Sequence, residues 1–139
     1  MATFKQLILL YVVNDGGELL YSNSLGSSNS LLKITLSNFH DIILSDNLLT
    51  NLPKLKHVDL SNNHELESLP YGLFTECTQL IRIELSNNCN LKSLQDSLFA
   101  GCILLRSVYL VSNNFEELRY ELKGVDLSRN TSIWWLSYW

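Results

Sequence analysis

"LKHVDLSNNHELESLPYGLFTECTQ", residues 55–79, is followed directly by "LIRIELSNNCNLKSLQDSLFAGCIL", residues 80–104. Both stretches carry Leu, Val or Ile, Leu, Asn, Leu, Leu, Phe and Cys at the same offsets. A chain that repeats such a pattern repeats a structural unit, and a unit of this length cannot bury its apolar face without a neighbour. The sequence therefore predicts a stack of similar coils.

The same anchors, apolar-x-x-apolar-x-apolar, recur along the chain. They occur at Leu7/Leu10/Val12, Leu31/Ile34/Leu36, Leu55/Val58/Leu60, Leu80/Ile83/Leu85, Leu105/Val108/Leu110 and Leu122/Val125/Leu127. Units thus begin near residues 7, 31, 55, 80, 105 and 122. Periods of about 20 to 29 residues with this pattern are typical of leucine-rich repeats. We interpret residues 1–139 as a single domain of such repeats.

Each unit contains a short strand. In "KHVDLS" the alternation places Val58 and Leu60 on one face and His57, Asp59 and Ser61 on the other. We expect strands near residues 33–37, 57–61, 82–86 and 107–111, stacked in parallel. The predicted fold is an α/β solenoid, a right-handed coil with a parallel β-sheet on its concave face and irregular or short helical segments on its convex side.

An asparagine follows the last strand anchor of several units at a fixed distance. These residues are Asn63, Asn88, Asn113 and Asn130. Because an amide both donates and accepts hydrogen bonds, a column of them can tie neighbouring turns together as a structural asparagine ladder. Asp15 and Phe39 occupy this position in the first two units, so those turns must be held differently.

The form LxxVxLSNNxxLxSLPxxLFxxCxxL, read from residues 55–80, resembles the leucine-rich repeats of extracellular animal proteins, especially Toll-type receptor ectodomains. The resemblance implies a protein-binding, receptor-like or secreted module in innate immunity, development or adhesion, with an extracellular location. Neither terminus carries the cysteine-rich cap of those relatives, which suggests an incomplete domain. An intracellular adaptor or scaffold in the cytoplasm, or a structural spacer, is the alternative.

Composition argues against several other classes of protein. The net charge of −4 and the pI near 5.2 disfavour nucleic-acid binding, which needs a basic surface. No apolar run approaches the roughly 18 to 20 residues of a membrane span. The cysteines, Cys77, Cys89 and Cys102, are too few and too scattered for a zinc site. Cys77 and Cys102 occupy one repeat position and are interpreted as small buried side chains, with a disulfide as the alternative, and Cys89 as a surface thiol.

Catalysis finds little support in the sequence. His40, His57 and His64 have no nucleophile or metal-ligand partner at a useful spacing. Asp59 and Glu84 should lie on adjacent strands, but the repeat itself places them there. We expect no enzyme, no cofactor and no metal.

The solvent face of the sheet is the most informative surface. Its expected columns are Leu9, Lys33, His57, Arg82, Ser107, Gly124; then Tyr11, Thr35, Asp59, Glu84, Tyr109, Asp126; then Val13, Ser37, Ser61, Ser86, Val111, Ser128. A cluster that mixes both charges with an aromatic ring is typical of protein recognition. We predict that another protein docks on the concave face at His57, Asp59, Arg82, Glu84 and Tyr109. Alternatively, these charges only solvate the sheet and pair with one another.

Overall fold

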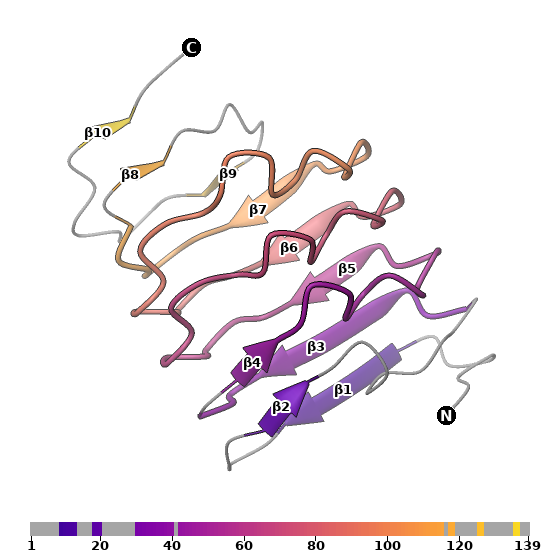
Figure 1. Ribbon diagram of the computed structural model, residues 1–139, viewed down its shortest axis with the longest axis horizontal. Coiled ribbons are helices and arrows are strands. Elements are labelled where there is room, and N and C mark those ends of the chain that lie inside the picture. Colours follow the sequence, from indigo (N-terminus) through magenta and orange to yellow (C-terminus); the bar gives the residue numbers. More distant parts are fainter. Residues whose placement is uncertain are drawn as a thin grey trace.

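The computed structural model describes residues 9–13, 18–20, 30–40, 42–115, 117–118, 125–126 and 135–136. Its strands are β1 (Leu9–Val13), β2 (Glu18–Leu20), β3 (Lys33–Ser37), β4 (Ile42–Leu44), β5 (His57–Asp59), β6 (Arg82–Glu84), β7 (Ser107–Tyr109), β8 (Glu117–Leu118), β9 (Val125–Asp126) and β10 (Trp135–Leu136). Figure 1 shows the main strands stacked side by side and running in the same direction. The predicted unit starts at Leu7 and Leu122 lie outside the described residues, as does Asn130.

The main sheet is parallel and has the order β1-β3-β5-β6-β7-β9. His57 pairs with Arg82 and Asp59 with Glu84, so the alignment of repeats that was read from the sequence gives the observed register. The predicted strand at 33–37 is confirmed in full. The next three strands end two residues earlier than expected. The right-handed coil and the concave curvature of the sheet stay predictions.

The chain turns at the same repeat position after each of these strands. Asn38, Asn62, Asn87 and Ser112 have φ angles of 62°, 58°, 61° and 57°. They occupy one repeat position, directly after β3 and three residues after the ends of β5, β6 and β7. This left-handed conformation turns the chain away from the strand direction. Hydrogen bonding to the next coil nevertheless continues, because the Asn62 amide donates to the Ser86 carbonyl at 3.0 Å.

The core lies behind one face of the sheet. Ile34, Val58, Ile83 and Val108 point into it and are no more than 1% exposed. Phe74 and Phe99 fill the side away from the sheet, with ring centroids 5.6 Å apart. Stacked apolar side chains thus form a continuous core across the coils, as a repeat architecture requires.

The segments opposite the sheet are turns. The prediction allowed either irregular or short helical segments on this side. The described residues contain no helix, so these segments are irregular. Within one segment the amides of Leu73, Thr75 and Cys77 each donate to the carbonyl three residues earlier. Such isolated bonds do not form the continuous ladder of an α-helix, and Pro70 supplies no donor. The sequence also gave no signal for the parallel pairs β2–β4 and β8–β10.

Candidate protein-binding site

The open face of the main sheet, meaning the face opposite the core, carries all the side chains predicted for recognition. Strands β5, β6 and β7 place them in register, with Arg82 opposite both His57 and Ser107, and Glu84 opposite both Asp59 and Tyr109. Each strand alternates, so the central Val58, Ile83 and Val108 are buried while their neighbours reach solvent. The structure therefore brings the five residues onto one surface.

Arg82 is the centre of this surface. Its guanidinium carbon lies 4.2 Å from the centroid of the Tyr109 ring. Its Nη2 also lies 3.4 Å from Oε2 of Glu84, within the same strand. The Arg82 side chain stays 48% exposed, so a partner could still reach it. The ring and the carboxylate limit the side chain's freedom, which lowers the entropy that a bound partner would have to remove.

Each of the two carboxylates is held by the serine two residues further along the chain. Oδ1 of Asp59 accepts hydrogen bonds from the Ser61 amide at 3.0 Å and from its hydroxyl at 2.6 Å. Oε1 of Glu84 accepts equivalent bonds from the amide and hydroxyl of Ser86. These hydrogen bonds fix the orientation of the two carboxylates.

This pairing corrects the expectation that three whole columns are exposed. Ser61 and Ser86 are only 8% and 9% exposed, because their hydroxyls fold under the carboxylates two residues earlier. Thr35 and Ser37 are 4% and 5% exposed. Both lie in β3, which pairs with β1 along its whole length. Gly124 and Ser128, at the end of their columns, lie outside the described residues.

Positive charge gathers beside the carboxylates. Burial lowers the pKa of His57, and the charges of Lys33, Arg82 and Lys56 lower it further. His57 is therefore predominantly neutral near pH 7. A hollow of about 370 Å³ lies here, lined by both carboxylates and by Lys33, His57 and Arg82. Lys33 was placed in the first exposed column, beside His57 and Arg82, but was left out of the predicted site, although its pairing with His57 was visible in the repeat alignment.

The arrangement suits recognition better than reaction chemistry. Both carboxylates are held by fixed hydrogen-bond donors and reach solvent, whereas reaction chemistry usually takes place in a site that excludes water. Within residues 30–40 and 42–115, no group of three His, Cys, Asp or Glu side chains could hold a metal ion. In the part of the chain that the structure describes, no helix has the length and hydrophobicity of a membrane span.

Comparison with known families agrees with the repeating strands and turns of the structure. Residues 53–115 match a family model described as leucine rich repeat. This segment is therefore similar to leucine-rich repeats. No curated protein matches the chain. Leucine-rich repeats generally mediate protein–protein interaction and are typically non-enzymatic.

The asparagines of the repeat form a hydrogen-bonded column in the core. Nδ2 of Asn63 donates to the carbonyls of Leu36 at 2.9 Å and Leu60 at 2.8 Å. Its Oδ1 accepts from the Phe39 amide at 2.9 Å, so the turn that lacks its own asparagine is held by the next coil. Asn88 repeats this geometry: its Oδ1 accepts from the Asn63 amide at 2.8 Å. Asn113 continues it, with Oδ1 accepting from the Asn88 amide at 2.7 Å.

The other repeated positions also have structural roles. Cys77 and Cys102 are buried and free, and Cys89 is exposed and free. The bridge between Cys77 and Cys102 that was kept as an alternative is thus not formed. The first asparagine of each "SNN" was not assigned a role from the sequence. It adopts the positive φ that Asn tolerates better than most residues, which was the available signal.

Proposed function

We propose that this chain is a protein-binding module whose partner docks on the open face through His57, Asp59, Arg82, Glu84 and Tyr109. The observation that carries the proposal is the position of Arg82, held between the Tyr109 ring and the Glu84 carboxylate while half exposed. Arg and Tyr are enriched among residues that dominate binding energy at interfaces. Parallel strands about 4.8 Å apart hold these side chains at fixed spacing, which reduces the entropy lost on binding.

The partner should present a carboxylate to Lys33 and His57. Glu84 already pairs with Arg82, and Asp59 is engaged by Ser61. In the described part of the chain no carboxylate lies within ion-pair distance of Lys33. An acidic group of the partner in the hollow would supply this charge and would favour the protonated form of His57. The interaction should therefore strengthen as the pH falls from 7 toward 6.

The proposal is tested with charge-matched variants. A displayed protein library is selected on the folded chain, and dissociation constants of the purified binders are measured for each variant. We expect Arg82→Glu and Tyr109→Ala to weaken binding by about 2 kcal/mol each. Lys92→Glu makes the same change in net charge at an exposed position in a turn segment away from the sheet, and should leave binding unchanged. Equal losses for Lys92→Glu and Arg82→Glu would rule out this docking site.

A receptor-like or secreted setting, outside the cell, is part of this proposal and is supported by the resemblance to Toll-type ectodomains. The alternative is a cytoplasmic adaptor or scaffold, which the free thiols of Cys77, Cys89 and Cys102 favour, since reducing compartments preserve thiols. A protease-protection assay on the tagged full-length product in intact cells separates the two. Digestion of the repeat from the outside supports the receptor, and protection until lysis supports the adaptor.

A further inference from the structure

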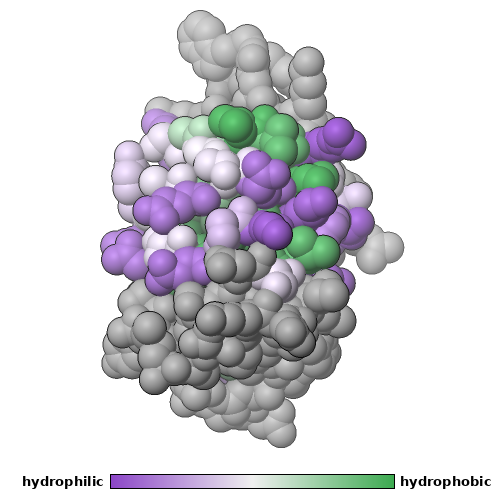
Figure 2. Space-filling view, turned by 90° about the vertical axis from the view of Figure 1, so that its right-hand side faces the viewer, coloured by the Kyte–Doolittle hydropathy of each residue, from purple (hydrophilic) through white to green (hydrophobic). Residues whose placement is uncertain are grey.

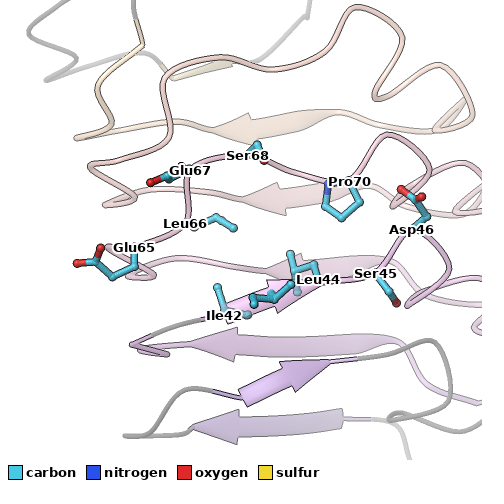
Figure 3. A pocket seen from close by; sticks show the side chains of 10 residues that line it. Ile42, Leu44, Ser45, Asp46, Glu65, Leu66, Glu67, Ser68 and Pro70 are labelled. Carbon is cyan, nitrogen blue, oxygen red and sulfur yellow. The ribbon is translucent and has the colours of Figure 1, made fainter.

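A groove lies away from the open face, between strand β4 and the chain segment 65–70. Its volume is about 590 Å³, within the range of sites that bind ligands. Figure 3 shows Ile42, Leu44, Leu66 and Pro70 between its two ends; the first three are buried and form the floor, and Pro70 is half-buried. Ile43 belongs to the same strand and is 59% exposed. Such exposure of a large aliphatic side chain beside a groove provides apolar contact area for a ligand.

The rim of this groove is negatively charged. Its charged lining residues are Asp46, Glu65 and Glu67, all exposed, and none of its lining residues is basic. Figure 3 shows Glu65 and Glu67 toward one end and Asp46 toward the other. Asp46 accepts a hydrogen bond from the Gly72 amide at 3.2 Å, and Glu65 accepts one from Asn90 at 3.3 Å. In the described part of the chain none of the three forms a salt bridge.

Both walls of the groove also offer backbone groups. Strand β4 pairs with β2 along one edge, and in a parallel pair alternate residues turn their amide and carbonyl toward the other edge. Among the described residues, no backbone hydrogen bond joins β4 to segment 65–70. The backbone groups of Glu67 and Ser68 form no hydrogen bond within that part of the chain. An extended peptide could therefore bond to the walls as an added strand.

We propose that this groove binds an extended segment of a partner protein in which apolar residues alternate with Lys or Arg. The apolar side chains contact the exposed Ile43 and the half-buried Pro70, and the basic side chains pair with Asp46, Glu65 and Glu67. Charge complementarity selects this occupant, since the rim carries carboxylates and no cation. The groove is a second site, independent of the open face. The open face carries Lys33, His57 and Arg82 and suits an acidic partner instead.

The experiment uses a capped, fluorescein-labelled hexapeptide of alternating Arg and Val, and measures anisotropy with the full chain. We expect saturable binding that Glu65→Lys/Glu67→Lys weakens at least tenfold. Glu76→Lys/Asp96→Lys makes the same change in net charge at exposed carboxylates outside the groove lining and serves as the matched control. Arg82→Glu, on the open face, should change the affinity less than twofold. Unchanged thermal midpoints establish that each variant folds.

Further outcomes separate the groove from general attraction between opposite charges. Replacing every Val of the peptide by Gly should also weaken binding at least tenfold, and NMR shifts should map to Ile42–Leu44 and Leu66. Equal loss in the control variant, or full retention by the Gly peptide, would mean attraction by charge alone and would overturn the proposal. A second result would also overturn the proposal: groove variants that keep peptide binding but lose self-association in a sizing experiment. The groove would then bind a second copy of the chain.

Discussion

Asn88 illustrates how much a single side chain does in this molecule. Its Nδ2 donates to Leu60 at 3.1 Å and Leu85 at 2.7 Å, and its Oδ1 accepts from the Asn63 amide at 2.8 Å. The side chain is fully buried. Each of these backbone groups would be buried without a partner if the amide were removed, and an unpaired buried group is costly.

Asn88→Leu should therefore lower the free energy of unfolding by about 1–3 kcal/mol, read from urea denaturation. Asn88→Asp should also destabilise, because a carboxylate cannot donate to the carbonyls of Leu60 and Leu85. The control substitution must be compatible with the backbone conformation at its position. Asn62 has a φ of 58°, so Ala there would be strained, whereas Gly adopts this angle readily. Equal shifts of the denaturation midpoint for Asn62→Gly and Asn88→Leu would contradict the assigned role of Asn88.

At the scale of elements, the turn segments of neighbouring coils approach closely at Gly101. A Cβ atom there would lie 2.2 Å from the Thr75 carbonyl oxygen, which belongs to the backbone and cannot rotate away. At Gly72 the nearest atom to a new Cβ would be Cβ of Asp46, at 3.4 Å. The first distance is a steric clash and the second is an ordinary contact.

Gly101→Ala should thus destabilise the chain by about 1–3 kcal/mol through displacement of the Thr75 segment. Gly72→Ala should stay within about 0.5 kcal/mol of the parent chain. Thermal unfolding followed by circular dichroism compares the two variants directly. A larger loss for Gly72→Ala than for Gly101→Ala would mean that the packing of these turns is wrongly described.

Some elements were predictable from the sequence and others were not. The strand at His57 and its pairing with Arg82 follow from the alternation and the repeat length, because both depend on local pattern alone. The burial of Ser61 does not, since it depends on a hydrogen bond that the Asp59 side chain makes after folding. Strand β4 was missed for a similar reason: "IIL" fits a strand or a buried coil, and its pairing with β2 decides.

At the scale of the whole molecule, the core determines which thiols react. Burial, with smaller contributions from Cys102 and Glu76, raises the pKa of Cys77 to about 12. Burial raises that of Cys102 to about 11, and its Sγ donates to the Phe74 carbonyl at 3.6 Å. Cys89 is exposed, with its sulfur 3.7 Å from Nδ1 of His64.

A thiol reagent at pH 8 should therefore modify Cys89 first in the folded chain. Only the thiolate reacts. The raised pKa of Cys77 should therefore by itself slow its modification about a thousandfold relative to a thiol of ordinary pKa. In urea above the unfolding midpoint all three cysteines should react at similar rates. Mass spectrometry of digested samples locates the label. Rapid modification of Cys77 or Cys102 under native conditions would contradict the buried core.

The asparagine column also affects how the coils open. Turn amides usually exchange with solvent hydrogen quickly, but the amides of Phe39, Asn63 and Asn88 donate to buried side-chain oxygens of the following coil. None of them can be released unless the neighbouring asparagine moves, so adjacent coils must open together. In deuterium oxide these three amides should be protected as long as those of Val58 and Ile83 in the strands, although they lie outside the strands.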